Sequence, residues 1–202
     1  HKAADTSIEP ASLTKLMSLY IISNALQNKL IHLNDRVLIS RHAWQEKGSR
    51  MFIKAGEKIP VQTLIQGVIV ASGNDTSVAL AEHVAGSDTG FVSLMNIAAQ
   101  QLHLQQSHFT NPTGLPGPAH TSSAQDLATI AQQLITRFPT LYTGYRQKWF
   151  SYNHIRQPNR NRLLWLDPSV DGLKTGHTST AGYCLVASAQ RQKMRLISVV
   201  LG

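Results

Sequence analysis

The sequence contains little cysteine and few acidic residues. It has one cysteine, Cys184, so no disulfide can form within the 202-residue chain. Asp and Glu total 11 against 19 Lys and Arg, which gives a formal charge of +8 and a pI of about 9.9. Such a charge favours polyanionic partners, namely nucleic acid, an anionic membrane surface or a polymer that carries carboxylates, without choosing among them.

Two further absences exclude classes of protein. No apolar run is long enough to span a bilayer. The nine histidines show no metal-ligand spacing with carboxylates or the cysteine, so we expect no metal and no other cofactor. The chain starts at His1 without a signal peptide and ends in the strand-like residues 196–202. These ends predict a fragment of a longer protein, truncated on both sides.

The distribution of apolar residues predicts one α+β domain over residues 1–202. Residues 13–30 are apolar on nearly every face, which is typical of a buried helix. We expect further helices over 62–71, 76–84, 88–104 (with Phe91, Leu94, Met95, Ala98 and Leu102 on one side) and from Thr121 or Ser122 to about Arg137, closed by Pro139. Short links join three strand candidates, 170–178, 181–189 and 194–201, which predicts an antiparallel meander.

The first stretch that suggests chemistry is Ser12-Leu13-Thr14-Lys15, at the expected start of the buried helix. The spacing of three residues places Lys15 on the same helix face as Ser12, one turn on. An unprotonated amine can take the hydroxyl proton and so activate the serine as a nucleophile. Alone, Ser-x-x-Lys is common, and a helix cap with a solvated lysine would explain it equally well.

Two later stretches change this interpretation. Ser72-Gly73-Asn74 lies at a predicted helix–helix joint, and Lys174-Thr175-Gly176 lies on the first strand of the predicted meander. Each occurs by chance in many proteins. Together, in the order Ser-x-x-Lys, Ser-x-Asn and Lys-Thr-Gly, they form the motif set of class A β-lactamases and penicillin-binding proteins.

The chain resembles one branch of these proteins over residues 10–202. The similar stretches are Pro-Ala-Ser-Leu-Thr-Lys at 10–15, Ser-Gly-Asn-Asp at 72–75, Ile-Arg-Gln at 155–157, Asn-Arg-Asn at 159–161, Val-Asp-Gly at 170–172, Lys-Thr-Gly-His-Thr at 174–178 and Arg-Leu-Ile-Ser-Val at 195–199. They look like the low-molecular-mass penicillin-binding proteins that are serine D-alanyl-D-alanine carboxypeptidases, the peptidase S11 type. The resemblance implies a helical cluster packed on an antiparallel sheet, without that family's first two strands and C-terminal β-domain.

The resemblance also implies a role for each motif residue. Ser12 would attack the peptide carbonyl, Lys15 would take its proton, and Ser72 would relay a proton to the leaving amine. A buried environment and the second cation Lys174 would lower the pKa of Lys15. Asn74 would hold a substrate amide. The terminal carboxylate of the substrate would bind Lys174, Thr175 and Arg160, and the backbone N–H groups of Ser12 and His177, beside Gly176, would form an oxyanion hole.

The activity implied is removal of the terminal D-alanine from peptidoglycan pentapeptides, with β-lactams as covalent inhibitors. The resemblance implies a periplasmic location on the outer face of the inner membrane, with membrane association only through parts absent from this sequence. Two alternatives are a non-catalytic peptidoglycan-binding module and a class A-like β-lactamase. The latter needs a glutamate between the second and third motifs, and no glutamate follows Glu82. Thr113 stands where close relatives would carry a histidine, which bears on deacylation.

A basic, aromatic stretch over residues 142–165 supports a different class of function. Arginines interleaved with aromatic residues can bind single-stranded nucleic acid. A solvated surface with aromatic rings packed beneath it is the simpler interpretation, with Arg160 near the site as an exception. We therefore expect no specific nucleic-acid partner.

Overall fold

A computed structural model describes residues 3–202. The first part of the chain forms η1 (Ala11–Leu13), α1 (Thr14–Gln27), β1 (Arg36–Leu38), α2 (Arg41–Gln45), β2 (Lys58–Pro60), α3 (Val61–Gln66), η2 (Gly67–Ala71), α4 (Asn74–Ala85) and α5 (Asp88–Gln101). The second part forms α6 (Ala124–Arg137), α7 (Pro139–Tyr142), η3 (Thr143–Arg146), β3 (Trp149–Tyr152), β4 (Ile155–Pro158), α8 (Leu163–Leu166), β5 (Val170–Thr178), β6 (Gly182–Arg191) and β7 (Met194–Val200).

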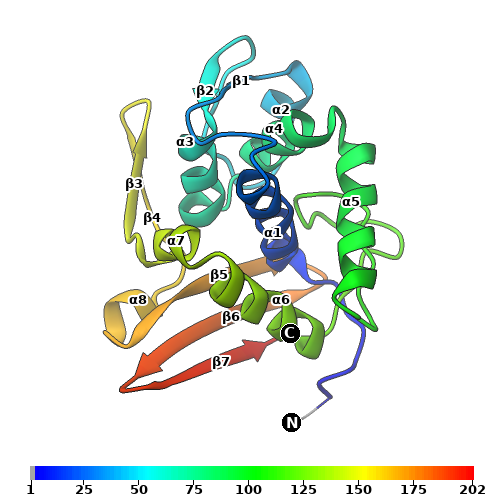
Figure 1. The fold of residues 1–202 in the computed structure, drawn as a ribbon, viewed down its shortest axis with the longest axis vertical. Helices are drawn as coiled ribbons and strands as arrows, with labels where there is room; N and C mark the ends of the chain where they lie inside the picture. The colour runs from blue at the N-terminus through cyan, green and yellow to red at the C-terminus, as the bar shows by residue number, and fades with distance from the viewer. Residues whose placement is uncertain (1–2) are drawn as a thin grey trace.

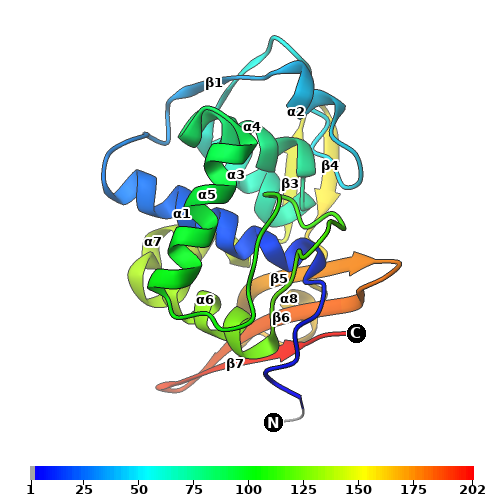
Figure 2. The same ribbon diagram turned by 90° about the vertical axis from the view of Figure 1, so that its right-hand side faces the viewer.

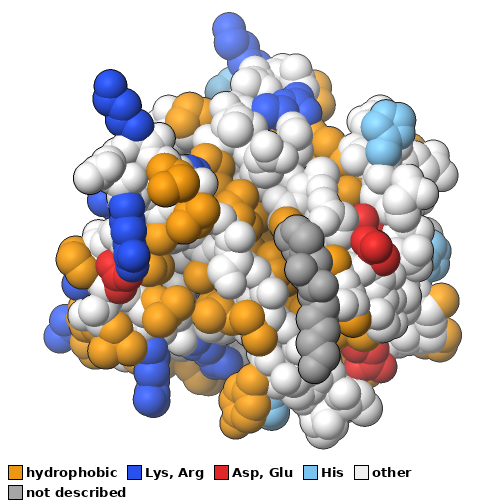
Figure 3. Space-filling model, turned by 90° about the horizontal axis from the view of Figure 1, so that it is seen from below, with side chains coloured by type: hydrophobic (Ala, Val, Ile, Leu, Met, Phe, Trp, Pro, Cys, Tyr) orange, Lys and Arg blue, Asp and Glu red, His pale blue; other side chains and the backbone are white. Residues whose placement is uncertain are grey.

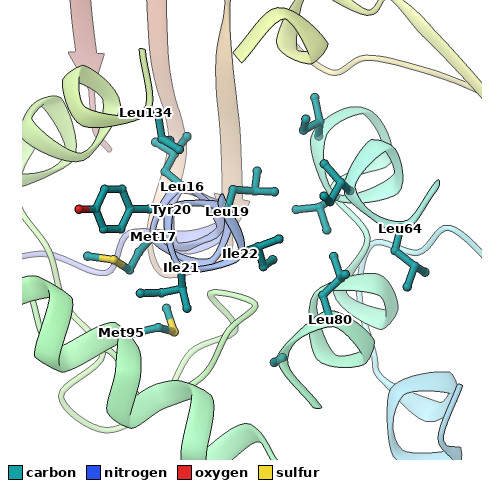
Figure 4. Close-up of a cluster of buried hydrophobic side chains, with 14 of the residues drawn as sticks. Leu16, Met17, Leu19, Tyr20, Ile21, Ile22, Leu64, Leu80, Met95 and Leu134 are labelled. Atoms are coloured by element: carbon teal, nitrogen blue, oxygen red, sulfur yellow. The ribbon is translucent and has the colours of Figure 1, made fainter. Parts of the chain in front are cut away.

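Helix α1 is the centre of the molecule, with α3, α4, α5 and α6 around it (Figures 1 and 2). All residues of α1 from Thr14 to Ser23 are buried, as the apolar sequence predicts. Side chains leave α1 on all sides, with Leu134 near Leu16, Met95 near Ile21 and Leu80 on the side of Ile22 (Figure 4). Burial of each such side chain contributes about 1.5–3 kcal/mol, so this helix is held rigidly and can support a site at its N-terminal end.

The sheet next to α6 is the predicted meander. Its strand order is β5-β6-β7, both pairs are antiparallel, and the strand bounds lie within two residues of the expected ones. Strand β5 is an edge strand of this sheet, and it contacts η1 at the mouth of α1. Two separate hairpin-like pairs, β1 with β2 and β3 with β4, lie on the helical side (Figure 1).

Several expected details are wrong. Ser123, not Thr121 or Ser122, caps α6, because its hydroxyl accepts the Asp126 backbone N–H. The helix does end at Arg137 before Pro139, as predicted, but Pro139 also begins a further helix, α7, where its missing N–H costs nothing. Leu94 is 38% exposed, so the buried side of α5 is narrower than predicted. Residues 62–71 form two segments, because the α-helix widens to π geometry from Gly67 to Ala71.

The underside of the molecule carries a group of apolar side chains bordered by lysines and arginines (Figure 3). Alternate residues of β7 contribute to the exposed surface, including Met194, Leu196 and Val200. Within residues 3–202, no helix is long and apolar enough to cross a membrane.

Candidate active site

The serine lies in a tight turn that two glycines approach closely. Ser12 is the middle residue of η1, is half-buried, and does not cap α1. A Cβ on Gly176 of β5 would lie 3.1 Å from the Ser12 backbone nitrogen. A Cβ on Gly114 would lie 1.8 Å from the Ala11 carbonyl oxygen, and Gly114 has φ +83°. Only glycine allows both segments to pack so near the serine backbone.

Lys15 is fully buried and its amine has three polar neighbours. Its Nζ lies 3.0 Å from Ser12 Oγ, 2.6 Å from Asn74 Oδ1 and 2.6 Å from the Thr113 carbonyl oxygen. The latter two atoms only accept hydrogen bonds, so together they use two N–H groups. A neutral amine then has its lone pair left, and the remaining neighbour is the Ser12 hydroxyl. The contacts therefore suit an unprotonated lysine that accepts the serine proton.

The electrostatics of Lys15 agree with this assignment. Burial lowers the pKa of Lys15 well below its ordinary value, and the positive charges of Lys174 and Arg160 lower it further. The nearby carboxylates of Asp75 and Glu46 act in the opposite direction and are smaller influences. Neither forms a salt bridge with Lys15. Burial and the neighbouring cations thus both favour the neutral form of an amine that would be charged in water.

The second motif sits where π geometry ends and α4 begins. Ser72 is buried and left-handed, with φ 57° and ψ 34°, a strained conformation for a residue other than glycine. A Cβ at Gly73 would lie 2.5 Å from Thr76 Oγ1 and 2.7 Å from Asp75 Oδ1, so the middle position of Ser-Gly-Asn has no room for a side chain. The turn therefore aims Ser72 and Asn74 at the cleft at the cost of local strain.

Lys174 links the sheet to this second motif. It is buried on β5, and its Nζ donates to Ser72 Oγ at 2.8 Å and to the Thr175 carbonyl at 2.9 Å. Burial, together with the charge of Arg160, lowers the pKa of Lys174 to about 7. Two N–H groups of the ammonium are used within the described chain, which leaves the third for an anionic ligand.

Asn74 positions groups on both sides of its amide. Its Oδ1 accepts from Lys15, and its Nδ2 donates to the Lys47 carbonyl at 2.6 Å. The second N–H of Nδ2 remains for a substrate carbonyl. Asn74 thus holds the lysine and the 47–49 loop in place, in addition to the substrate contact that the sequence predicts.

Asp75 fixes the segment that follows this loop. Its buried carboxylate accepts the backbone N–H groups of Met51, Phe52 and Ile53 at 2.9–3.3 Å. These bonds compensate a buried charge that has no cationic partner at salt-bridge distance. They also bring residue 49 to the wall of the cleft beside the second motif.

A buried histidine anchors the loop that presents the Thr113 carbonyl. His120 Nδ1 accepts the Thr110 backbone N–H at 3.0 Å, so its Nε2 carries the proton and donates to Thr14 Oγ1 at 2.8 Å. Burial lowers the pKa of His120 to about 4, so the ring stays neutral at physiological pH. The loop is therefore tied directly to the first turn of α1, between Ser12 and Lys15.

The residues surround a cleft of about 780 Å³. Ser12 and Ser72 lie in its wall together with Arg160, Thr175, Gly176 and His177. Further along β6, the exposed Tyr183 ring lies against the His177 ring at 4.3 Å between centroids. No Asp or Glu of the described residues lines the cleft, which makes it a cationic site for an anionic ligand. Residues 3–202 also hold no group of three or more His, Cys, Asp and Glu suited to a metal ion.

The structure brings every predicted site residue to this cleft. Direct hydrogen bonds join Lys15 with Ser12 and with Asn74, and Lys174 with Ser72, while the other predicted residues line the wall. Sequence reasoning missed the Thr113 carbonyl, the anchoring bonds of Asp75 and the role of His120. Asp75 directly follows the second motif, which could have been a signal; a main-chain carbonyl leaves none.

Comparison with known proteins agrees with this geometry. The family model described as D-alanyl-D-alanine carboxypeptidase, peptidase S11, matches residues 1–202. The chain belongs to the peptidase S11 family. Its fold is that of the penicillin-binding D,D-peptidases: penicillin binding protein 5 of Haemophilus influenzae superposes with a TM-score of 0.96 at 48% identity, over 98% of this chain and 59% of that one. The carboxypeptidase DacD of Francisella tularensis gives 0.98 at 34% identity, over 100% and 61%.

Curated members of the S11 family are similar in sequence over part of their length. The D-alanyl-D-alanine carboxypeptidase DacC of Escherichia coli K12 is 47% identical, over 98% of this chain and 52% of its own. DacA of Haemophilus influenzae is 48% identical, over 96% and 50%. The chain thus spans about half the length of the curated relatives it matches.

Proposed function

We propose that this protein is a serine D,D-carboxypeptidase that releases the terminal D-alanine from peptidoglycan stem peptides. The observation that carries the proposal is the neighbourhood of Lys15. A buried amine with two pure acceptors as neighbours and the Ser12 hydroxyl 3.0 Å away is arranged as a base for that hydroxyl.

Acylation follows from these contacts. The Ser12 Oγ–H proton moves to the neutral Lys15 amine as Oγ forms a bond to the carbonyl carbon of the penultimate residue. The bond from this carbon to the leaving nitrogen then breaks, and the nitrogen receives a proton through Ser72. The backbone N–H groups of Ser12 and His177 stabilise the oxyanion, a contribution of about 3 kcal/mol for each donor. The products are the acyl-serine and free D-alanine.

Recognition of a free C-terminus is assigned to the cationic end of the cleft. The terminal carboxylate binds the protonated Lys174, the Thr175 hydroxyl and Arg160, while Asn74 donates to an amide carbonyl of the substrate. A carboxylate next to Lys174 favours the charged form of that lysine, so substrate binding itself raises its pKa. The site therefore selects a substrate whose last residue is unblocked.

Deacylation distinguishes this proposal from the β-lactamase alternative. Class A enzymes use a glutamate to activate the hydrolytic water, and no acidic residue of the described chain lines this cleft. Lys15, returned to its neutral form, is the base available for water attack on the acyl ester. A penicilloyl ester is therefore expected to persist. A non-catalytic peptidoglycan-binding module would not need a base beside the Ser12 hydroxyl, so the contact between Lys15 and Ser12 disfavours that alternative.

The proposed substrate and inhibitors support a location in the bacterial cell envelope. We assign peptidoglycan pentapeptides as substrates and β-lactams as covalent inhibitors, with the full-length protein on the outer face of the inner membrane. The net charge of +8 suits a polymer rich in carboxylates.

The test is covalent trapping of Ser12. Wild type, Ser12→Ala and the surface control Ser93→Ala are incubated with benzylpenicillin, and intact masses are recorded with circular dichroism as the folding check. We expect a stable adduct on wild type and Ser93→Ala only, and D-alanine release from an acyl-D-Ala-D-Ala peptide by the same two proteins. An adduct on folded Ser12→Ala, or none on folded wild type, would contradict the proposal.

A further inference from the structure

A second hollow, of about 440 Å³, adjoins the cleft. Its lining consists of Trp149, Pro158, Asn159, Arg160, Arg162 and Trp165. Arg160 and Arg162 also line the catalytic cleft, so the two hollows share a wall. Ser12 does not reach the second hollow. It is therefore a continuation of the cleft beyond the arginines, on the side where we place the substrate carboxylate.

Buried asparagines fix the two arginines in this wall. Residues 159–162 alternate between buried Asn and exposed Arg. Asn159 Nδ2 donates to the Gln147 carbonyl at 3.0 Å, and Asn161 Nδ2 donates to the Gly172 carbonyl at 3.0 Å. Because the asparagines are held in the interior, both guanidinium groups are presented to the outside from a constrained backbone.

The opposite wall is aromatic. Trp149 begins β3 and Trp165 lies in α8, and the β3–β4 pair and α8 lie on the same side of the molecule (Figure 1). The indole rings meet edge to face at 6.0 Å and remain 43% and 40% exposed. Arg156 lies over the Trp149 ring at 4.2 Å, and Lys148 lies 5.9 Å from the Trp165 ring.

This environment is apolar on its walls and cationic at its rim. No Asp or Glu of the described residues lines it, and Asp167 at the end of α8 is engaged by Arg191 at 2.7 Å. Exposed indoles offer flat surface for aliphatic or planar groups, and free guanidinium groups attract carboxylates. A ligand with an aliphatic chain that ends in a carboxylate matches both features.

We propose that this hollow, the Trp149–Trp165 subsite, binds the side chain of a leaving D-amino acid that is longer than alanine and carries a carboxylate. The proposal rests on the proposed function, because it uses the same acyl transfer from the same scissile carbonyl. Only the leaving amine differs, and it still takes one proton as the C–N bond breaks.

Three synthetic substrates separate the two parts of the subsite. Each has the same acyl-D-Ala donor, followed by D-Ala, by Nε-acetyl-D-Lys or by Nε-succinyl-D-Lys. They are assayed with the full chain of wild type, Trp165→Ala and Arg162→Ala. The matched controls are Trp44→Ala, whose ring is 42% exposed on the distant α2, and Arg41→Ala, an exposed arginine of the same helix.

Trp165→Ala should lower kcat/KM about fivefold to tenfold for both lysine derivatives, as expected for loss of one stacking surface, and leave D-Ala release unchanged. Because Arg162 also lines the catalytic cleft, Arg162→Ala is judged by ratios: it should lower kcat/KM for the succinyl substrate about twofold to fivefold more than for the other two, and this extra loss should vanish at high salt. Both controls should behave like wild type.

Unchanged ratios among the three substrates, or equal losses on all three, would overturn the subsite. Trp165-dependent binding of a single-stranded oligonucleotide with unchanged ratios would overturn it in favour of nucleic-acid binding. Failure of wild type to release D-alanine from the first substrate would instead refute the proposed function itself, so the two failures are distinguishable.

Discussion

The helical body and the sheet each contribute one buried lysine to the cleft, and the two differ in their partners. Lys15 of α1 faces two pure acceptors and a hydroxyl, so all its neighbours are satisfied by an uncharged amine. Lys174 of β5 has a hydroxyl and one carbonyl as neighbours, and lies buried behind Ser72 and Thr175 of the cleft wall. Burial lowers the pKa of both, yet the site needs one neutral and the other charged.

The difference shows how position alone can give one residue type two functions. The charge of Lys174 lowers the pKa of Lys15, whereas the charge of Arg160 lowers the pKa of both. The two lysines therefore titrate as a coupled pair: when Lys174 loses its proton, the pKa of Lys15 rises. At neutral pH the expected working form is a neutral Lys15 beside a charged Lys174.

Removal of the helix-side amine should have the largest effect. Lys15→Met keeps much of the side-chain volume but has no base, so the second-order rate constant for acylation by benzylpenicillin should fall by about 10³-fold or more. Stopped-flow measurement of acylation gives this value, with the exposed Lys54→Met as control. If Lys15→Met acylates within about tenfold of wild type, Lys15 is not the base.

Removal of the sheet-side cation should have a smaller and different effect. Lys174→Met loses the carboxylate partner, so kcat/KM for an acyl-D-Ala-D-Ala peptide should fall about 10²-fold. It also removes a charge that depresses the pKa of Lys15, so the rising limb of the pH–rate profile should move to higher pH. Lys193→Met, at a surface turn, should change neither quantity. If the rising limb does not move in Lys174→Met, the charge of Lys174 does not influence the pKa of Lys15, and the two lysines do not titrate as a coupled pair.

Stability should depend on pH through the same two groups. Their pKa values are lowered in the folded state, so between about pH 7 and about 10.4 the unfolded chain binds more protons than the folded one. The free energy of unfolding should therefore rise with pH over this window. Urea unfolding at a series of pH values measures it, and the Lys15→Met/Lys174→Met double variant should flatten the slope. A wild-type slope that the double variant retains would contradict this origin.

The smallest effect concerns the exposed arginine that acts on both lysines. Arg160→Ala should raise the pKa of Lys174, so the falling limb of the kcat/KM profile should move to higher pH by less than about one unit, because solvent screens the charge. KM should rise at the same time, since a carboxylate contact is lost. High salt should move the falling limb of the wild-type profile in the same direction. If neither Arg160→Ala nor high salt moves this limb, the charge of Arg160 does not influence the pKa of Lys174.

The spacing of apolar residues was sufficient to predict the buried helix and the antiparallel meander. Few other structures fit an apolar run as long as α1. Few others fit three short apolar segments separated by short turns, as in the meander. The cap of α6 was placed wrongly because Thr121, Ser122 and Ser123 can all cap a helix. Which of them does so depends on where the backbone turns from extended to helical geometry. Leu94 was misplaced because periodicity shows which side is apolar, but not how wide the covering neighbours are.

In the site, the functional side chains that lie together could be predicted, but the main-chain groups that hold them in place could not. The three motifs identify Ser12, Lys15, Ser72, Asn74 and Lys174 because each position needs a particular functional group. The bonds that hold them use the main chain of residues 47, 51–53 and 113, where any amino acid supplies the same N–H and C=O. Such contacts depend on tertiary placement alone and leave no pattern to find.

The Thr113 carbonyl has a practical consequence for engineering. Lys15 is held there by the backbone, and the path of the loop is set by Gly114 and His120. The Thr113 side chain is also buried, and its hydroxyl donates to Asn111 Oδ1 at 2.9 Å, so a substitution at this position reaches the loop that orients the base. A saturation library at this one codon would therefore vary the support of the base without changing any motif residue, which makes position 113 a remote control of how fast an antibiotic becomes attached.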